Sequence, residues 1–551
     1  MSLLALDRLS VTLQGRTILS EVSLSLAPGE ILGLVGESGS GKSMTALAVM
    51  GLLPEGARVT GSVRLDGREV LGLPEAALNR LRGAEAGMIF QEPMTALNPL
   101  MSIGDQVAEV LRIHGRMGRA AALEVARERL DRVGLTAPRF PLSLYPHELS
   151  GGQRQRVAIA LAIALRPKLL IADEPTTALD VTTQAEVLRL IAGLARDEGM
   201  GLMLITHDLA VVAGMADRVA VMQGGRIVET APTEALFRAP RAPYTHDLLR
   251  AATHRPGRVS QGEYLNQEET HAVSSWQKYS KSDDAPLLTV ENATRIYRLP
   301  RPSAFAPHSE LRAVDGVSFT LQPGESLGLV GESGCGKSTL TGAILGLDAL
   351  QGGAIRLGNH AVGPKMPRAA RADVQIVFQD PYGSFNPRQR VERLVAEPFH
   401  LTGRPADWRA RVAEALREVG LDPADGRRFI HEFSGGQRQR LAIARALIIR
   451  PKLIVLDEAV SALDVRVRAQ VLDLLAELQA RHGLAYLFIS HDLSVVHAVT
   501  SRCLIMQAGR IVEDGPTEAI FTNPRHDYTR RLLAATPRIP AGWIPKEEPA
   551  S

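Results

Sequence analysis

The sequence predicts two tandem α/β domains, each built on a mainly parallel β-sheet, and three observations support this prediction. First, the glycine-rich segment Gly36 to Ser43 (GESGSGKS) recurs as GESGCGKS at Gly331 to Ser338. Second, from Ser150 onward the matching motifs of the two halves stand at a constant offset of 284 residues, which indicates one fold used twice. Third, short runs that are apolar on both faces, such as Ile31 to Val35, alternate with helical patterns, as a buried parallel sheet requires.

Composition narrows the class of protein. The chain has 551 residues, 45% hydrophobic and 22% charged, which is typical of a soluble globular protein of several domains. Its longest apolar run, Val157 to Leu165, has nine residues, far fewer than the roughly 20 needed to cross a bilayer. The net charge of +3 is too small to predict a nucleic-acid-coating surface. The two cysteines, Cys335 and Cys503, lie in different halves, which excludes a disulfide framework and fits a reduced cytosolic setting.

The repeat also gives the expected boundaries. We expect domains over residues 1–252 and 287–538, a linker over 253–286 and a flexible tail over 539–551. The linker segment is polar, lacks helical or strand periodicity, and carries four basic and five acidic side chains. Between Gln91 and Ser150 the pattern is helical, for example over 120–133, which predicts a helical lobe apart from the sheet.

Each glycine-rich segment lies between an apolar strand and an apolar helical stretch. Its glycines allow successive N–H groups to face one anion, and the helix N-terminus adds about half a positive charge. Lys42 would contact the outer phosphates and the Ser43 hydroxyl would bind Mg²⁺, with Lys337 and Ser338 in the same roles. An ordinary turn is the alternative for one copy, but two copies in this context make it negligible. The predicted ATP-phosphate residues are Gly36, Glu37, Ser38, Gly39, Ser40, Gly41, Lys42 and Ser43, and Gly331, Glu332, Ser333, Gly334, Cys335, Gly336, Lys337, Ser338 and Thr339.

An acidic pair follows a later apolar run in each half. Asp173 and Glu174 come after Leu169 to Ala172, and Asp457 and Glu458 occupy the matching positions. The aspartate at a strand end can hold Mg²⁺ through water, and the glutamate can deprotonate the attacking water, a role worth about 10²–10⁴ in rate. A solvated loop is the more frequent explanation for one such pair, but its position after the phosphate loop, twice over, favours catalysis.

A third motif, SGGQ, completes the set in each half: Ser150, Gly151, Gly152 and Gln153, and Ser434, Gly435, Gly436 and Gln437. Small residues at a helix start form a second anion site. With Gln91 and Gln379, Asp180 and Asp464, and His207 and His491, the order of motifs resembles that of ATP-binding cassette (ABC) ATPases. The resemblance covers nearly the whole chain apart from the linker and tail.

The resemblance implies P-loop NTPase domains, each with an antiparallel β part and a helical lobe, and ATP and Mg²⁺ as cofactors. It also implies that the SGGQ of one domain caps the ATP held by the other. One composite site would combine Lys42, Gln91, Asp173, Glu174 and His207 with Ser434 to Gln437, and the other Lys337, Gln379, Asp457, Glu458 and His491 with Ser150 to Gln153. The implied catalytic residues are Glu174, Glu458, His207 and His491, and the implied Mg²⁺ ligands are Ser43, Gln91, Asp173, Ser338, Gln379 and Asp457. Both sites are expected to hydrolyse ATP.

The glutamine loops (91–99 and 379–388) and the domain ends (Pro240 to Thr245 and Pro524 to Thr529) resemble those of the oligopeptide, dipeptide and nickel importers. Fused domains resemble importers for glutathione or microcin C. The resemblance implies an ATPase subunit that energises a bacterial peptide importer. It would work with two transmembrane permease subunits and a periplasmic solute-binding protein, with no nucleic acid, peripherally on the cytoplasmic face of the inner membrane. Import of nickel or another small solute stays open.

Three departures from this family pattern qualify the resemblance. The chain lacks the cysteine-rich tail of many relatives, and Ala459 stands where proline commonly follows the acidic pair. Tyr297 stands where the family stacks a ring on adenine, but its counterpart is Leu13, so we expect weaker ATP binding at the first site. Soluble twin-domain ATPases that act on ribosomes are the rival class. They carry a long charged helical linker, whereas 253–286 is near-neutral and irregular.

Overall fold

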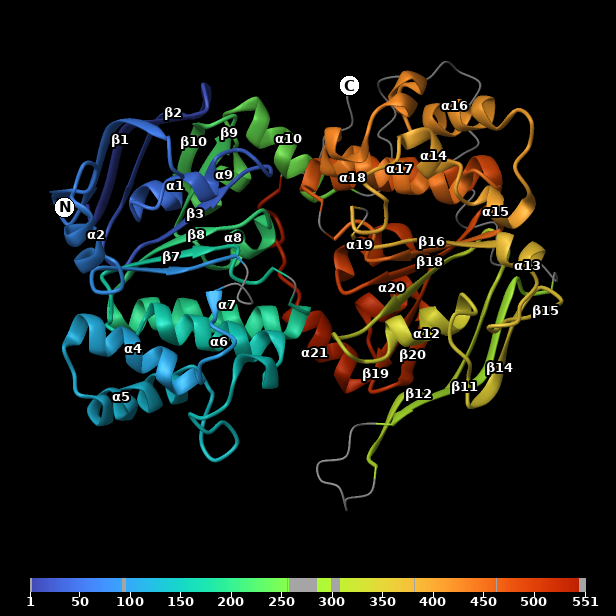
Figure 1. The fold of residues 1–551 in the computed structure, drawn as a ribbon, viewed down its shortest axis with the longest axis horizontal. Helices are drawn as coiled ribbons and strands as arrows, with labels where there is room; N and C mark the ends of the chain where they lie inside the picture. The colour runs from blue at the N-terminus through green and yellow to red at the C-terminus, as the bar shows by residue number, and fades with distance from the viewer. Residues whose placement is uncertain are drawn as a thin grey trace. The chain divides into compact units, whose positions relative to one another are not determined.

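The two halves of the chain fold as two separate units with the same order of elements (Figure 1). The computed structural model describes residues 2–91, 96–177, 179–254, 256, 285–298, 308–380, 382–461 and 463–544. The first unit comprises Met1–Thr253 and Ala535–Glu548, and the second His254–Ala534 and Pro549–Ser551. Most of the predicted linker, residues 92–95 of the first glutamine loop, and 545–551 of the predicted tail lie outside the described residues.

The first unit is centred on a six-stranded sheet in the order β10-β9-β3-β8-β7-β6. All neighbours are parallel except β10, which forms an antiparallel hairpin with β9. Strands β3, β7 and β8 are buried along their whole length, because helices cover both faces of the sheet and their residues are apolar on both sides. The α/β fold class and the predicted strand at Ile31–Val35 are therefore confirmed.

A second, antiparallel sheet of the first unit has the order β2-β1-β4-β5. Burial alternates along β2, so that one face packs on the core and the other is exposed. The antiparallel part that the family resemblance implied is thus present in this unit, and its counterpart in the second unit has the order β12-β11-β14-β15.

The predicted helical lobe of the first unit consists mainly of α4 and α5, which pack on each other and on α6 (Figure 1). Ile103, Val107 and Leu111 are buried on α4 at the spacing of one helical face. The helix predicted over 120–133 is confirmed as α5, Arg119–Arg132. In the second unit shorter helices, α14 to α16, take this place.

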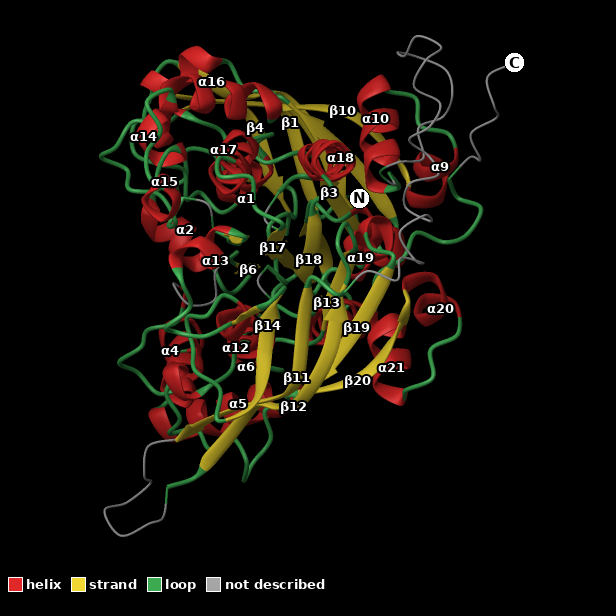
Figure 2. Cartoon of the chain, turned by 90° about the vertical axis from the view of Figure 1, so that its right-hand side faces the viewer, coloured by secondary structure: helices red, strands yellow, loops and turns green. Residues whose placement is uncertain are grey.

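The second unit repeats the six-stranded sheet in the order β16-β17-β18-β13-β19-β20. Strands β18, β13, β19 and β20 lie side by side in Figure 2. The helix after the phosphate loop begins at Lys42 in the first unit and at Lys337 in the second, which is two residues earlier than the apolar pattern alone suggests at Met44.

The elements of the first unit are β1 (Leu4–Leu13), β2 (Arg16–Leu26), β3 (Ile31–Val35), α1 (Lys42–Val49), β4 (Arg58–Leu65), β5 (Arg68–Glu69), α2 (Glu75–Leu81), β6 (Ala86–Ile89), α4 (Ile103–Gly115), α5 (Arg119–Arg132), α6 (Gly151–Ala162), β7 (Leu169–Asp173), α7 (Val181–Glu198), β8 (Gly201–Ile205), α8 (Leu209–Met215), β9 (Arg218–Gln223), β10 (Arg226–Pro232), α9 (Thr233–Arg238) and α10 (Pro243–Ala252). Those of the second are β11 (Leu288–Arg298), β12 (Glu310–Leu321), β13 (Ser326–Val330), α12 (Lys337–Ile344), β14 (Gly352–Leu357), β15 (His360–Ala361), α13 (Arg368–Ala372), β16 (Val374–Val377), α14 (Val391–Val395), α15 (Phe399–Thr402), α16 (Trp408–Glu418), α17 (Gly435–Leu447), β17 (Leu453–Asp457), α18 (Val465–His482), β18 (Ala485–Ser490), α19 (Leu493–Val499), β19 (Arg502–Gln507), β20 (Arg510–Pro516), α20 (Thr517–Thr522) and α21 (Asp527–Ala535).

Part of the segment expected as a flexible tail contacts the first unit. The Trp543 ring lies 5.8 Å from the Phe237 ring, centroid to centroid, and Arg238 Nη1 donates a hydrogen bond to Gly542 O at 3.1 Å. These two residues of the predicted tail therefore contact α9 of the first unit. Within the residues that the structure describes, none of the helices has the length and apolar character to span a membrane.

Candidate active sites

The phosphate loop of each unit requires glycine at its first position. Gly36 has φ 153°, and an added Cβ would lie 2.2 Å from Met222 O of β9. A Cβ added to Gly331 would likewise lie 2.2 Å from Met506 O. No other residue fits without moving the sheet, because the atom it would meet is backbone. The loop therefore leaves β3 or β13 pressed against the neighbouring strand.

The loop lysine holds each loop curled. Lys42 Nζ donates hydrogen bonds to Gly36 O and Glu37 O, both at 2.8 Å, and Lys337 Nζ donates to Gly331 O at 2.7 Å and Glu332 O at 2.9 Å. An ammonium surrounded by its own loop carbonyls is a positive centre around which the loop N–H groups are arranged. This geometry fits a phosphate group.

The first site also fits Mg²⁺. Ser43 Oγ donates to Asp173 Oδ1 at 3.2 Å, so two hard oxygen ligands of the kind that Mg²⁺ prefers lie together. Burial raises the pKa of Asp173, more than the Ser43 hydrogen bond and the Lys42 charge lower it. The buried Ser40 Oγ has no hydrogen-bond partner among the described residues, as a hydroxyl in a ligand cradle would. The residues present therefore match a magnesium–phosphate ligand.

Glu174 is the centre of a polar cluster in the first unit. Gln91 Nε2 donates to its Oε2 at 3.0 Å, Thr177 Oγ1 donates to the same oxygen at 3.1 Å, and His207 Nδ1 lies 3.3 Å from Oε1. Burial alone would raise the pKa of Glu174, but the hydrogen bond and charge of His207, with Thr177 and Lys42, hold it below its ordinary value. The carboxylate is therefore ionised at neutral pH, as a base must be.

Both glutamates have a strained backbone. Glu174 has φ 46° and Glu458 has φ 49°, in the left-handed region that costs a non-glycine residue about 1–2 kcal/mol. Each is held there because its N–H donates a hydrogen bond to a carbonyl at the end of the neighbouring strand: Glu174 to Ile205 O at 2.9 Å and Glu458 to Ile489 O at 2.8 Å. Strain that recurs at the same position in both units indicates a functional constraint.

The second site has a tighter histidine contact and fewer other bonds. His491 Nδ1 lies 3.0 Å from Glu458 Oε1. Burial lowers the pKa of His491, but the hydrogen bond and charge of Glu458 and the charge of Asp492 raise it above its ordinary value overall. In the described part of this unit, Ser338 and Gln379 form no hydrogen bond with the acidic pair. The two predicted catalytic sets are thus similar but not identical.

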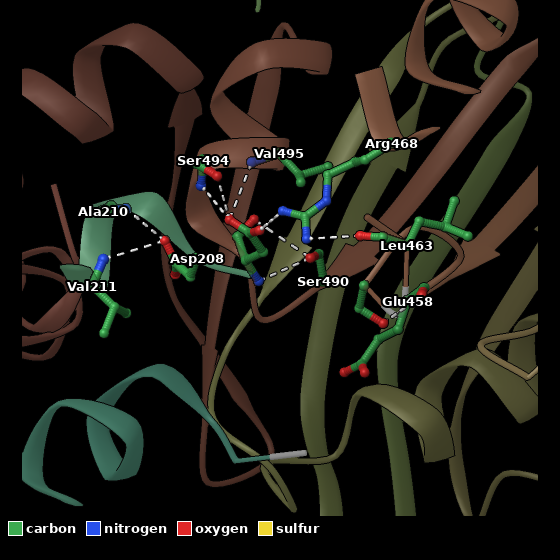
Figure 3. Close-up of polar contacts among 11 residues, drawn as sticks. Asp208, Ala210, Val211, Glu458, Leu463, Arg468, Ser490, Ser494 and Val495 are labelled. Carbon is green, nitrogen blue, oxygen red and sulfur yellow. Dashed lines mark hydrogen bonds and ion pairs between the residues drawn. The ribbon is translucent and has the colours of Figure 1, made fainter. Parts of the chain in front are cut away.

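The aspartates that follow His207 and His491 have a structural role that the motifs did not predict. Asp208 caps α8 by accepting from the N–H groups of Ala210 and Val211 (Figure 3). Asp492 caps α19 in the same way and also accepts from Arg468 Nη1 at 2.8 Å. Arg468 Nη2 donates to Leu463 O at 3.3 Å (Figure 3). Arg468 therefore joins the segment that follows β17 to the segment that follows β18.

The first unit has no counterpart of this arginine, since Gln184 stands at the matching position 284 residues earlier. The repeated histidine–aspartate dipeptide and the arginine–glutamine difference were the sequence signals that could have identified these residues.

Each SGGQ motif begins a helix. Ser150 caps α6, with its N–H bonded to Gln153 Oε1 at 2.9 Å, and Ser434 caps α17 through Gln437 at 3.0 Å. An added Cβ on Gly152 would lie 2.3 Å from Thr183 Cγ2, so the motif passes close to α7. The side-chain hydrogen bonds of these serines and glutamines stay within the capping box in the described residues. The motif therefore offers an exposed helix N-terminus.

Tyr297 and Leu13 occupy matching places in the antiparallel sheets. Both lie at or near the end of the first strand of their unit, Leu13 on β1 and Tyr297 on β11. The Arg295 guanidinium carbon lies 4.8 Å from the centroid of the Tyr297 ring. The ring of Tyr297 is half-buried and offers a flat aromatic surface that a leucine lacks.

We predict that His491 titrates above its ordinary midpoint because of Glu458. The Cε1–H resonance of His491, followed by NMR against pH, should show a midpoint above 6.5 in the wild type. In Glu458→Gln the midpoint should fall, because the groups that raise the pKa are weakened while burial, which lowers it, remains. Equal midpoints in the two proteins would contradict the assignment.

Comparisons with known proteins identify the family of the chain. The model of the ABC transporter family matches residues 19–177 and 314–461, and that of the oligopeptide/dipeptide transporter C-terminal region matches 228–272 and 512–551. The chain is 48% identical over 527 residues to the peptidoglycan transport ATP-binding protein YejF of Agrobacterium fabrum, covering 94% of this chain and 93% of that protein. It is 48% identical over 539 residues to the glutathione import ATP-binding protein GsiA of Escherichia coli, covering 94% and 86% respectively. The chain belongs to the ABC transporter family and is an ABC transporter ATPase with two ATP-binding domains in one polypeptide.

Proposed function

We propose that this ATPase energises a bacterial importer of short peptides or solutes that contain them. The observation that carries the proposal is the match of both C-terminal regions to the oligopeptide/dipeptide transporter type, within a resemblance that covers 94% of the chain. One relative is named for glutathione, which is a tripeptide, and another for peptidoglycan, whose strands carry short peptides. Short peptide chains are the chemistry that these names share.

In the proposed mechanism, Lys42 and Lys337 leave their own loop carbonyls to contact the outer phosphates of ATP. Ser43, Gln91 and Asp173 in the first site, and the matching residues in the second, would hold Mg²⁺, which would neutralise phosphate charge. Glu174 orients and deprotonates the attacking water, and its strained backbone keeps its carboxylate at the strand end. His207 contacts this glutamate and would also contact the γ-phosphate, so it could report the loss of that phosphate.

Each ATP would lie between a phosphate loop and the SGGQ motif of the other domain. The exposed N-termini of α6 and α17 supply N–H groups and the positive end of a helix dipole for this purpose. ATP then joins the domains because one γ-phosphate satisfies anion sites on both. Hydrolysis removes the bridge and the domains part.

The helical lobe is the proposed contact with the permease subunits. Leu100 and Ile113 of the first lobe expose 85% and 66% of their surface, so the lobe presents apolar side chains that a partner could cover. Gln106 of α4 accepts from Asn98 N and donates to Asn98 O, both at 3.0 Å. The lobe is thereby bonded to the segment that follows Gln91. A displacement of the lobe would reach the cluster around Glu174. Because it would reach the membrane only through the permease subunits, the protein would act peripherally, on the cytoplasmic face of the inner membrane.

Transport can be tested with the complex of this chain, its permease subunits and a solute-binding protein in liposomes. We expect binding protein loaded with a di- or tripeptide to stimulate ATPase activity at least about tenfold and to drive peptide uptake. Binding protein without a peptide is the control. Stimulation by Ni²⁺ alone, with no response to peptides, would overturn the peptide proposal and favour a nickel importer.

Replacing both proposed general bases should separate ATP binding from hydrolysis. We expect Glu174→Gln with Glu458→Gln to lower kcat about 10²–10⁴-fold, because the water loses its base, while ATP is still bound. Steady-state ATPase assays and nucleotide titrations measure the two effects. Glu234→Gln with Glu518→Gln is the matched control, since both carboxylates are exposed and lie on α9 and α20. Near-normal turnover in the first variant would refute the assignment.

The aromatic difference should make the two sites unequal in ATP affinity. Stacking of a base on an aromatic ring contributes about 1–3 kcal/mol, so Tyr297→Leu should weaken the second site about fivefold or more. Leu13→Tyr should strengthen the first site. Each measurement uses the full chain with the lysine of the other site replaced by alanine (Lys42→Ala or Lys337→Ala). Equal ATP affinity at the two wild-type sites would contradict this expectation.

A further inference from the structure

A buried tyrosine from the end of each domain is bonded to the phosphate loop of the same unit. Tyr244 lies on α10, and its Oη accepts a hydrogen bond from Glu37 N–H at 3.2 Å. Tyr528 lies on α21 and accepts from Glu332 N–H at 3.0 Å. The two tyrosines expose only 6% and 3% of their surface. The contact therefore occurs twice, at matching positions of two sequences that are far from identical.

The tyrosine is placed by an acidic residue of the neighbouring hairpin. Glu229 of β10 accepts from Arg241 N at 2.9 Å and Ala242 N at 3.0 Å, just before α10 begins. Glu513 of β20 accepts from Arg525 N at 2.8 Å and His526 N at 3.2 Å in the same way. Burial would raise the pKa of Glu229, but these backbone hydrogen bonds and the charge of Arg241 hold it below its ordinary value. The carboxylate therefore stays ionised and holds the helix start in place.

The same hairpin also supports the first glycine of the loop. Met222 of β9 contacts Gly36 through its carbonyl, and β9 is paired with β10, which carries Glu229. The β9–β10 hairpin thus positions both Gly36, which precedes Glu37 in the chain, and Tyr244, which bonds to the N–H of Glu37. The Glu37 peptide is held at both ends, by Tyr244 at its N–H and by Lys42 at its carbonyl.

We expect ATP binding to affect these two hydrogen bonds to Glu37 differently. The lysine must turn from the loop carbonyls towards a phosphate, whereas the tyrosine is bonded to the N–H of Glu37 and not to these carbonyls, so its bond can stay. Without the hydroxyl, the N–H of this half-buried residue would lose the bond to the tyrosine, and more of the ordering of the loop would fall to the ligand.

We propose that Tyr244 and Tyr528 are positioning residues that link the C-terminal region of each domain to its phosphate loop and thereby set its ATP affinity. The C-terminal motifs that serve as markers of the importer branch would then act on the nucleotide through the phosphate loop. Because linkage is reciprocal, ATP binding also stabilises the docked position of α10 and α21. The inference depends only on ATP binding and holds for any transported solute.

The first test is the full-length double variant Tyr244→Phe with Tyr528→Phe, which removes only the two hydroxyl groups. We expect the Kd for ATP, by isothermal titration, and the KM to rise about threefold to tenfold, the loss of one ordinary hydrogen bond per site. The kcat should stay within about twofold. A fall in kcat with unchanged KM, or no change in either, would overturn the proposal.

The matched control is Tyr486→Phe. The Tyr486 hydroxyl is also buried and also bonded to backbone, donating to Leu475 O at 2.9 Å, but it lies in the core of the second unit away from the loop. We expect this variant to lose stability without a change in ATP affinity. An equal rise in Kd in the control would show that the effect is a general loss of stability and would overturn the proposal.

Reciprocity supplies a second measurement. Hydrogen–deuterium exchange should show that ATP protects residues 243–252 and 527–535 in the wild type and protects them less in the double variant. Should the double variant not fold, each single variant should give a two-phase ATP titration in which one phase is unchanged. Equal protection by ATP in variant and wild type, or a single unshifted phase, counts against the inference.

Discussion

The parallel pairing of three strands is the constraint on which each active site depends. In the first unit β8 lies between β3 and β7, with Leu34 and Asp173 both in register with Ile205. The carboxyl ends of parallel strands meet at one edge of a sheet, so the phosphate loop after β3, the acidic pair after β7 and the histidine after β8 arrive together. Residues more than 160 positions apart in the chain therefore share a site. The second unit repeats the register with β13, β17 and β18.

That edge has opposite effects on the two neighbouring carboxylates. Burial raises the pKa of Asp173, whereas contacts with His207 and Thr177 hold the pKa of Glu174 below its usual range. A bound cation would therefore favour the ionised form of Asp173, whereas Glu174 is already ionised without one. The strained backbone of Glu174, held by the bond to Ile205, turns the two side chains into these different surroundings. The same division recurs at Asp457 and Glu458.

The two units nevertheless differ around this common frame. Arg468 joins Leu463 to Asp492 in the second unit, where the first has Gln184. Asp180 accepts hydrogen bonds from the hydroxyl groups of Thr182 and Thr183. The matching positions in the second unit are Arg466 and Val467. Such differences lie in the segments that follow the proposed catalytic glutamate, so they can change how each site closes without removing a proposed catalytic residue.

The sequence by itself determined the duplicated α/β fold and the family, because motif order and a constant offset need no knowledge of distances. It also predicted the residues of each candidate site. It predicted the strand at Ile31–Val35, and it predicted a helical pattern over 120–133 that the structure places at Arg119–Arg132, because a continuous apolar run and a helical pattern are local signals. Only the tertiary structure decided what those residues contact. The strain at Glu174, the Arg468 link and the bond from Tyr244 to Glu37 join residues distant in sequence, and no local pattern encodes such contacts. They arise because the register of the sheet and the path of its final hairpin bring separate segments to one edge, which is a property of packing.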